Sequence, residues 1–515
     1  MHSFNPILQT DYPDPDVIRV DDTYYMVSTT MYFMPGGAIL KSYDLVNWEI
    51  VTYIFDKLDD TPAERMEQEL TRYGKGMWAA SIRYHEGRFY VAFVSHQQPD
   101  TYLFTADSIY GPWTKSTIKG YYHDCSLLFD DDGRVFITYG NREIHLTELK
   151  ADLTGPKEGG IDKIIVSETD DVILGHEGSH FYKINGKYYL FTIHWPKSTG
   201  IRTEACFCAD TVDGEYKGGD VLSDDCGFFG CGVAQGGIVD TPNGKWYGIL
   251  FRDNGAVGRI PVLVPVTWQN DMPVFGVNGK IPSNFEVASS RPYYRYEPLY
   301  TSDDFVYDPD KDGHAKLKLQ WQWNHQPDNE RWRLLPEGGL AIRTGKLCAN
   351  VTHARNCLTQ RMMFPKCEAE VTVDCSNLRE GDIAGLCALQ GCYGLIGVMK
   401  SAGNYILVKM CHNDEGKATA IGMNDFLPAQ PVDMVRLSSP VVTLCLKANF
   451  DDLQDKLDFF YQKDKRWVKF GASHDLKFRL DHFTGCRFGL FVYSTKTLGG
   501  EAVFKKFIYR YDRER

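Results

Sequence analysis

The sequence predicts an all-β protein in which a five-bladed β-propeller is followed by a β-sandwich. Two observations predict it: a repeated strand–turn–strand motif in the first 300 residues, and short alternating polar and apolar runs between turn residues in the remainder. The 515 residues suffice for two or three domains. The pattern loosens into Pro, Ser and Asn after Ile281, so we expect a propeller over 1–300 and a sandwich over 301–515.

The repeat is a tight turn followed by an aromatic, apolar strand. A short apolar run precedes each copy, so each copy predicts a β-hairpin. The copies lie about 46 to 65 residues apart, which is enough for a four-stranded sheet with its connections, and five such sheets arranged radially form a propeller. The five copies begin at Asp21, Glu86, Asp132, Asn185 and Asn243.

Equivalent positions in the copies should converge, because the innermost strand of each blade lines the central channel. Counting eleven residues back from the aromatic pair of copies two to five gives Trp78, Asp124, Glu177 and Gln235. In the first copy the count falls on Pro13, and Asp14 follows it. Each acid alone could be a turn residue, but three acids at equivalent places favour a shared function at one mouth of the channel.

Three converging carboxylates suit either a cation site or acid–base chemistry. Calcium accepts such oxygens, but the neighbouring residues supply an apolar wall: Tyr32, Phe33, Met34 and Trp78. Acids beside an aromatic wall favour a sugar site. Glycoside hydrolysis needs one protonated carboxyl to donate to the leaving oxygen and one ionised carboxylate to act on water or on the anomeric carbon. A third carboxylate nearby would raise the pKa of the acid by like-charge repulsion.

Six short motifs follow one another around these acids. They are NPIL at 5–8, YPDPD at 12–16, KSYDLVNW at 41–48, GMWAA at 76–80, DCSL at 124–127 and EGSH at 177–180. In this order they resemble glycoside hydrolase family 43, in the branch of β-xylosidases and α-L-arabinofuranosidases, and the later half resembles the C-terminal β-sandwich of those enzymes. The resemblance implies an inverting mechanism with Asp14 as general base, Glu177 as general acid and Asp124 as the residue that tunes and orients the acid.

The resemblance also implies substrate-binding residues. Arg259 resembles an arginine that reaches a ring hydroxyl of a pentose, with a salt bridge inside blade five as its alternative role. Trp78 and Phe33 resemble pocket walls, although either could belong to the core, and Gln235 completes the channel set. By the same resemblance, many relatives place a His just before the position of Gln235, where it helps to hold a central cation or water. Ala234 stands there instead, so we expect no required cofactor, and a structural Ca²⁺ is disfavoured.

Two patterns are typical of zinc but have unsuitable spacing, so we expect no metal site. Residues 176–180 spell H-E-G-S-H, a motif that binds zinc only on a helix. In the predicted hairpin His176 and His180 are roughly 13 Å apart. Cys206 and Cys208 are separated by one residue, whereas zinc-binding pairs usually have two to four between them.

The composition limits the class of partner. The net charge of −12 disfavours nucleic acid and anionic membranes, and no window approaches the ~18 apolar residues of a membrane span. The N-terminus has no basic region followed by a long apolar stretch, and the 14 cysteines lack the regular spacing of a disulfide framework. We therefore expect a cytoplasmic protein with a neutral oligosaccharide partner. The oligomeric state stays open.

The leading hypothesis is an inverting exo-hydrolase that releases xylose from the ends of short xylo-oligosaccharides. Removal of α-L-arabinofuranose from arabinoxylan-derived oligosaccharides is a close second or a parallel activity, and either could dominate. By resemblance, the second domain lends a loop that closes one side of the pocket and favours attack at chain ends. The alternatives from other classes are a non-catalytic carbohydrate-binding propeller and a protein-interaction scaffold, and a scaffold does not require three acids.

Overall fold

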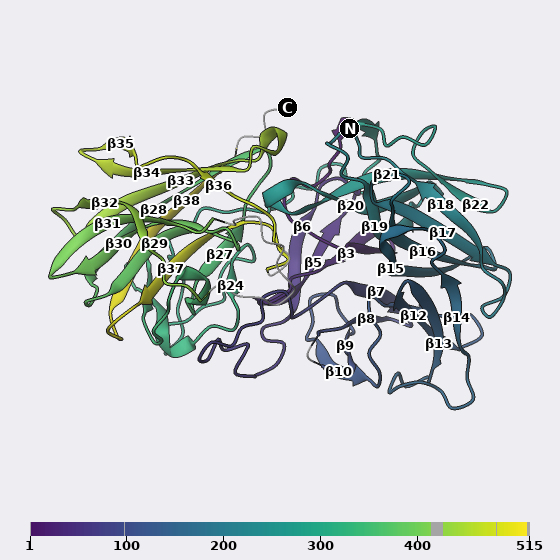
Figure 1. Ribbon diagram of the computed structural model, residues 1–515. Helices are drawn as coiled ribbons and strands as arrows, with labels where there is room; N and C mark the ends of the chain where they lie inside the picture. The colour runs from purple at the N-terminus through teal and green to yellow at the C-terminus, as the bar shows by residue number, and fades with distance from the viewer. Residues whose placement is uncertain (1, 97, 414–425, 480–481, 512–515) are drawn as a thin grey trace.

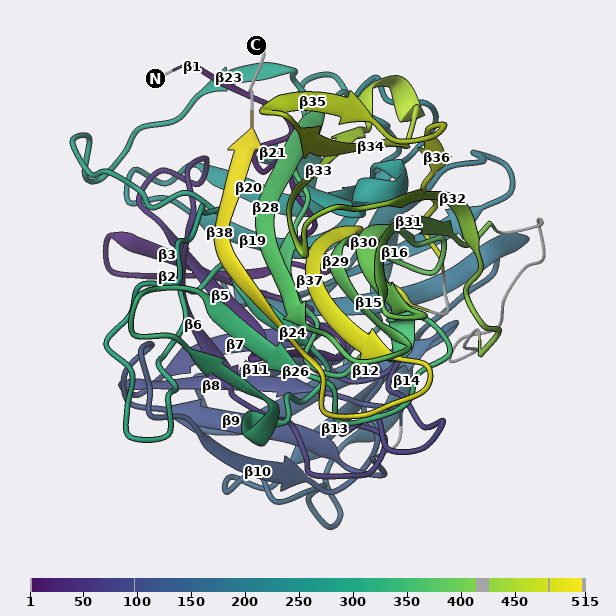
Figure 2. The ribbon, with the colours of Figure 1, turned by 90° about the vertical axis from the view of Figure 1, so that its left-hand side faces the viewer.

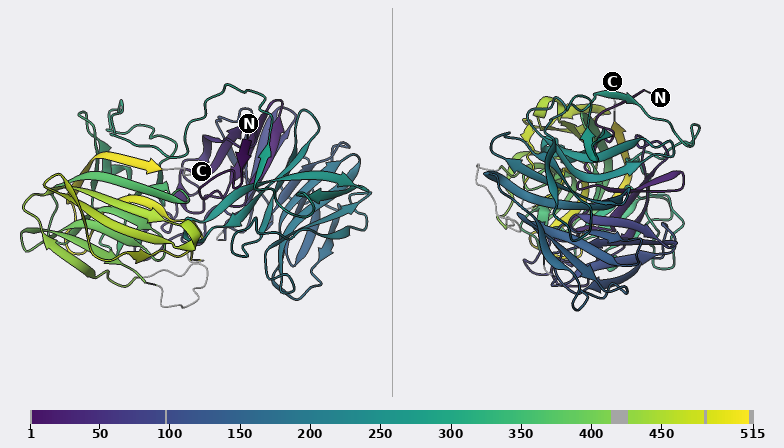
Figure 3. Two further views of the ribbon diagram at one scale, coloured as in Figure 1. Left: turned by 90° about the horizontal axis from the view of Figure 1, so that it is seen from above. Right: turned by 90° about the vertical axis from the view of Figure 1, so that its right-hand side faces the viewer.

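The computed structural model describes residues 2–96, 98–413, 426–479 and 482–511, and these are almost entirely β-structure (Figure 1). A propeller built from the first part of the chain lies beside a β-sandwich built from the second, and the view from above shows the same two bodies (Figure 3). Five blades and a C-terminal concanavalin-like sandwich confirm the predicted fold. In the described part of the chain, no helix has the length and apolar character needed to cross a bilayer.

Each blade is a four-stranded antiparallel sheet whose strands follow chain order from the channel outward. Blades one and two consist of β2 (Asp16–Val20), β3 (Thr23–Ser28), β5 (Gly36–Ser42) and β6 (Glu49–Phe55), and of β7 (Ala80–His85), β8 (Arg88–Phe93), β9 (Thr101–Ala106) and β10 (Thr114–Ile118). Blade three consists of β11 (Ser126–Phe129), β12 (Val135–Asn141), β13 (Glu143–Leu149) and β14 (Asp162–Ser167). Blades four and five consist of β15 (Val172–Ile184), β16 (Lys187–Pro196), β17 (Thr203–Ala209) and β18 (Lys217–Leu222), and of β19 (Val233–Asp240), β20 (Trp246–Asp253), β21 (Arg259–Gln269) and β22 (Met272–Phe275).

The inner hairpin of every blade is one copy of the sequence repeat. The pairs are β2–β3, β7–β8, β11–β12, β15–β16 and β19–β20. Their turns use residues that tolerate a left-handed backbone, such as Asn185 (φ 51°) with Gly186 (φ 80°) between β15 and β16. The turn residues therefore place the hairpins, and the two residues that follow each turn pack into the apolar clusters between neighbouring blades.

A buried ionic network inside the channel joins the inner strands of four blades. The Asp16 carboxylate of blade one accepts from Arg83 of blade two at 2.7 Å and lies 3.1 Å from His180 Nδ1 of blade four. Arg83 also donates to Ser126 Oγ of blade three at 2.6 Å. Burial opposes the charge on Asp16, but Arg83 and His180 outweigh it and lower its pKa to about 2. This network fixes the relative positions of the strands that carry the predicted site residues.

The sandwich consists of two large antiparallel sheets. The first has the order β32-β31-β30-β29-β37-β27-β24-β4, and the second has the order β25-β26-β38-β28-β33-β34-β35, with β36 paired to β34. The first sheet contains β32 (Pro431–Arg436), β31 (Asn404–Cys411), β30 (Gly394–Ser401), β29 (Asp382–Leu389), β37 (Arg487–Ser494), β27 (Leu358–Arg361), β24 (Gln322–Asn324) and β4 (Phe33–Met34). The second contains β25 (Trp332–Leu334), β26 (Leu340–Arg343), β38 (Glu501–Tyr511), β28 (Lys366–Asn377), β33 (Val441–Asn449), β34 (Lys456–Lys463), β35 (Arg466–Lys469) and β36 (His474–Asp475). Figure 2 shows these strands in front of the propeller.

The two domains share a sheet. Strand β4 comes from the propeller segment, yet it pairs with β24 of the sandwich through Met34–Trp323 and Phe33–Asn324. An apolar cluster continues across this junction, with propeller and sandwich residues buried together: Met31, Tyr32, Phe33, Tyr73, Cys357, Tyr393, Phe491 and Tyr493. The domains therefore form one folded unit.

The connection between the domains contacts both of them. After β22 the chain forms β23 (Asn284–Glu286), which pairs with the N-terminal β1 (His2–Phe4). It then crosses blade one, where the Glu297 N–H donates to Glu49. At Thr301 the backbone N–H already donates to Gln360 of the sandwich.

Candidate active site

The three predicted carboxylates meet at one end of the channel. Asp14 and Asp124 each lie two residues before the inner strand of their blade, β2 and β11, and Glu177 lies within β15. The Nε2 atom of His123 lies 3.8 Å from a carboxylate oxygen of Asp124 and 3.8 Å from one of Glu177. The charge of Asp14 also acts on Asp124. The repeat therefore selected acids that the fold brings together.

Unusual backbone conformations aim these side chains. Asp14, Asp124 and Gln235 have φ values of 50°, 47° and 57°, which non-glycine residues seldom adopt. Such strain is concentrated at functional sites, where the surrounding structure holds it. Next to Glu177, Gly178 (φ 65°) leaves no room for a Cβ, which would lie 2.7 Å from the Gln235 side chain. Glycine at 178 therefore lets blades four and five approach closely beside the acid.

Asp14 is buried and held by two donors. Arg259 Nη1 donates to one carboxylate oxygen at 2.7 Å, and the Thr29 hydroxyl donates to the other at 2.8 Å. The backbone N–H of Arg259 donates in turn to Asp11 at 2.8 Å, and Arg259 Nε lies 3.4 Å from Asp253 of blade five. Arg259 thus bridges blade five to blade one through Asp14, and it also forms, with Asp253, the ion pair inside blade five that the sequence offered as its alternative role.

Asp124 and Glu177 share a charged histidine. Burial opposes the cation on His123, but the carboxylates of Asp124 and Glu177 outweigh it and raise its pKa to about 9. Burial raises the pKa of Asp124 to about 7; the Glu177 and Asp14 charges act in the same direction, and His123 opposes them. Asn141 Nδ2 donates to Glu177. The pKa of Asp124 is therefore set jointly by its own burial and by the charges of its neighbours.

An aromatic wall borders the carboxylates. The half-buried ring of Trp78 stacks on Phe483, with 5.7 Å between centroids and 16° between planes, and meets His96 edge-on at 3.9 Å. The Arg259 guanidinium lies between the rings of Phe251 and Phe483, at 4.5 and 4.8 Å. Phe483 comes from the sandwich. The second domain therefore supplies part of the wall beside Trp78.

The other two predicted binding residues lie deeper. Phe33 is 1% exposed, and the Arg487 guanidinium covers its ring at 3.4 Å. The structure thus places Phe33 in the interdomain core, since strand pairing with β24 buries it. Gln235 is also buried, and its backbone N–H donates at 2.7 Å to the carboxylate of Glu204, whose pKa burial raises well above its usual value.

Several residues of the site are not predicted from the sequence, among them Thr29, His123, Asn141 and Phe483. His123 directly precedes Asp124, so adjacency alone could have drawn attention to it. Asn141 ends β12, and Phe483 is more than 300 residues away from the acids along the chain. No local pattern marks either of these two, because their role depends on contacts between blades and between domains.

In the described part of the chain, neither zinc-like pattern brings its own two residues into one candidate metal group. His176 and His180 lie on β15 and contact different partners: Thr192 and Glu168 for His176, and Asp16 for His180. Among the described residues, no candidate metal group includes a cysteine. At the channel position where relatives were expected to carry a His, Ala234 packs against Ile193 and Phe251 and offers no ligand atom.

Comparison with known proteins identifies this arrangement. The model of "Glycosyl hydrolases family 43" matches residues 3–273, and the model "Beta xylosidase C-terminal Concanavalin A-like domain" matches residues 312–510. The chain belongs to glycosyl hydrolase family 43. It is therefore a glycoside hydrolase, of a family whose members invert the anomeric configuration, and its substrate is a carbohydrate.

Relatives of this family 43 enzyme match over nearly its whole length. A "Beta-xylosidase" of Formosa agariphila is 25% identical over 99% of this chain and 90% of its own, and a "Xylosidase/arabinosidase 43B" of Humicola insolens is 26% identical over 98% and 97%. A solved "Bifunctional GH43-CE" structure from Bacteroides eggerthii is 40% identical with a TM-score of 0.89. It covers 99% of this chain, which spans 63% of that longer one.

Proposed function

We propose that this family 43 enzyme removes xylose from the ends of short xylo-oligosaccharides, with α-L-arabinofuranose as a second sugar that it releases. The observation that carries the proposal is the group of three carboxylates beside a wall of Trp78 and Phe483. An aromatic wall suits the apolar face of a pentose, and the acids suit its glycosidic bond. The names of the relatives, β-xylosidase and xylosidase/arabinosidase, support both sugars.

In the proposed mechanism Asp14 is the general base. Its carboxylate takes a proton from a water molecule, whose oxygen then attacks the anomeric carbon from the face opposite the leaving group. Arg259 and Thr29 hold the carboxylate in one orientation. The base is therefore already positioned before the reaction, which lowers the entropic cost of reaching the transition state.

Glu177 is the general acid in this mechanism. It gives its proton to the glycosidic oxygen as the bond to the anomeric carbon breaks, and the pair of electrons leaves with that oxygen. Asn141 orients the Glu177 carboxyl group through its hydrogen bond. Asp124 lies in the same cluster, where His123 Nε2 is 3.8 Å from each of the two carboxylates, and a neighbouring negative charge disfavours the ionised form of a carboxylic acid.

Two variants that change the charge beside Glu177 should move the alkaline limb of the pH–activity profile in opposite directions. Asp124→Asn removes a negative charge, so the acid should lose its proton more easily and the limb should move to lower pH. His123→Gln removes a positive charge that lies 3.8 Å from a carboxylate oxygen of Glu177, so its limb should move to higher pH. Profiles of kcat/KM on xylobiose measure both limbs. If the alkaline limb lies at the same pH in both variants, the charges of Asp124 and His123 do not tune the acid.

The reaction should release its sugar with inverted configuration. An inverting site places acid and base on opposite sides of the sugar with room for a water molecule, so a β-xyloside should first give α-xylose. Proton NMR during the first turnovers measures this, and β-xylose as the first product would contradict the proposed roles.

A panel of aryl glycosides tests the substrate. We expect hydrolysis of β-xyloside and α-L-arabinofuranoside and much slower hydrolysis of glucoside and galactoside. Faster release of arabinose than of xylose from matched oligosaccharides would make the enzyme chiefly an arabinofuranosidase. If none of these aryl glycosides is hydrolysed, a non-catalytic carbohydrate-binding propeller is favoured.

A reducing compartment such as the cytoplasm is part of the proposal. It is supported by the cysteines, because all 14 are free thiols and ten are buried. Short oligosaccharides would then reach the enzyme after uptake into the cell.

A further inference from the structure

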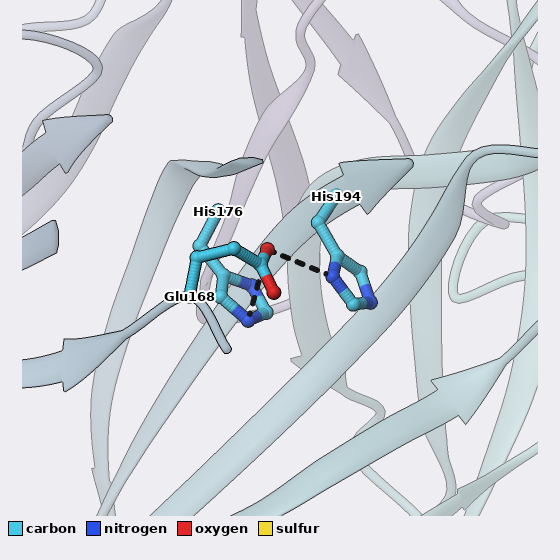
Figure 4. A group of neighbouring side chains, drawn as sticks. All are labelled: Glu168, His176 and His194. Atoms are coloured by element: carbon cyan, nitrogen blue, oxygen red, sulfur yellow. Dashed lines mark hydrogen bonds and ion pairs between the residues drawn. The ribbon is translucent and has the colours of Figure 1, made fainter. Parts of the chain in front are cut away.

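A second group of ionisable residues lies in blade four, and its members take no part in the proposed mechanism, although one of them shares β15 with Glu177. Glu168 follows β14, His176 lies on β15 and His194 lies on β16. Their side chains are 3%, 6% and 3% exposed. Figure 4 shows both imidazole rings beside the Glu168 carboxylate, with dashed lines to each of them. Buried clusters of this composition need a physical reason, because desolvating a carboxylate is costly.

Two nitrogen atoms converge on one oxygen atom in this cluster. His194 Nδ1 lies 3.1 Å from Glu168 Oε2, and His176 Nε2 lies 3.6 Å from the same oxygen. The ligand atoms of all three residues fall within 4.8 Å of one another. A tetrahedral ion with ligands at about 2.1 Å separates neighbouring ligand atoms by about 3.4 Å, and the two measured distances bracket that value.

The opposite nitrogen of each ring is held by an outer partner. His176 Nδ1 lies 3.0 Å from the Thr192 hydroxyl, and His194 Nε2 lies 2.8 Å from Asp220. The rings stack at 4.3 Å between centroids with 14° between planes. Metal-binding histidines characteristically pair their second nitrogen with a hydroxyl, carbonyl or carboxylate, which fixes the tautomer and the ring orientation. Here both rings are held with the free nitrogen directed at Glu168.

We propose that Glu168, His176 and His194 bind a divalent transition-metal ion, with zinc as the best fit. Two imidazoles and one carboxylate suit Zn²⁺, whereas calcium and magnesium prefer oxygen ligands alone. A water molecule would complete four-coordination. The ion would tie the segment after β14 to the two inner strands of blade four, and His176 directly precedes Glu177. Its role is structural support next to the acid.

The competing occupant is a proton. A protonated His194 between Glu168 and Asp220 would also satisfy these groups, with His176 packed beside them. The two cases differ in a measurable way, because only the metal site takes up zinc with a fixed stoichiometry.

The test begins with the full-length protein freed of metal by dialysis against a chelator. Titration with ZnCl₂ in competition with a chromophoric chelator should show one tight site per chain, and Tm should rise with zinc. Cobalt in place of zinc should give the visible absorption of a tetrahedral site. Absence of a stoichiometric zinc site in the wild-type protein would overturn the proposal.

Variants assign the ion to this cluster. His194→Ala and the isosteric Glu168→Gln should abolish tight binding, and Asp220→Asn should weaken it about 10- to 100-fold by releasing the outer partner. His123→Ala is the matched control, since His123 belongs to the other His–carboxylate group, and it should keep one zinc. Zinc that persists in folded His194→Ala and Glu168→Gln, or that is lost in His123→Ala, contradicts the assignment. If both cluster variants fail to fold, Asp220→Asn and the cobalt spectrum of the wild-type protein decide.

Discussion

Glu177→Gln is expected to lose about 10²–10⁴-fold more activity on xylobiose than on nitrophenyl β-xyloside. Nitrophenolate leaves without a proton, whereas the sugar oxygen of xylobiose needs one. The glutamine keeps a carbonyl oxygen that can accept from Asn141, so the local structure should persist. Steady-state kcat/KM on the two substrates measures the effect.

Asp14→Asn is the matched comparison. Water must be activated whatever group leaves, so this variant should lose activity on both substrates by the same factor. The amide oxygen can still accept from Arg259, and the amide NH₂ group can donate to the Thr29 hydroxyl, so thermal melting of both variants should stay close to that of the parent. Equal substrate ratios in Glu177→Gln and Asp14→Asn would mean that the acid and base are wrongly assigned.

Deleting residues 301–515 should abolish soluble, active enzyme. The deletion leaves β4 without its partner strand β24 and exposes the apolar surface of Met31, Tyr32 and Phe33 to water. It also removes Phe483 from the wall beside Trp78. Expression, gel filtration and activity of a 1–300 fragment test this expectation.

Phe483→Ala in the full chain separates the loss of the wall beside Trp78 from the loss of the interdomain contacts. Phe483 is only partly buried at the edge of the interdomain core, so this variant should remain soluble with a small fall in Tm. Its kcat/KM should fall roughly tenfold, as expected for removing one aromatic contact of about 1.5 kcal/mol. A soluble, fully active 1–300 fragment would show instead that the sandwich is an independent module.

Much of the propeller and its three acids could be predicted from the sequence. Hairpins are encoded locally, by turn residues such as Asn185 and Gly186 and by the aromatic strands that follow them. Because a propeller repeats its blades around one axis, equivalent places in the repeat become neighbours in space. Simple counting therefore selected Asp124 and Glu177 and came within one residue of Asp14.

Side-chain partners across the fold could not be predicted in this way. Phe33 stands in an aromatic stretch that resembled a pocket wall, but pairing of β4 with β24 buries it under Arg487. His176 matched a helical zinc motif with His180, yet its neighbours are Glu168 and His194, because adjacent antiparallel strands bring residue 194 beside residue 176.

The sequence by itself determined the blade count, the convergence of the carboxylates and the order of the domains, since these follow from local propensity and from periodicity. Only the tertiary structure decided that Arg259 holds Asp14, that His123 carries a positive charge between Asp124 and Glu177, and that Phe483 joins the wall. Each of these depends on the distance between groups from different blades or domains, and on their burial. Charge and stacking energies vary steeply with both quantities, and neither is encoded in any short stretch of the chain.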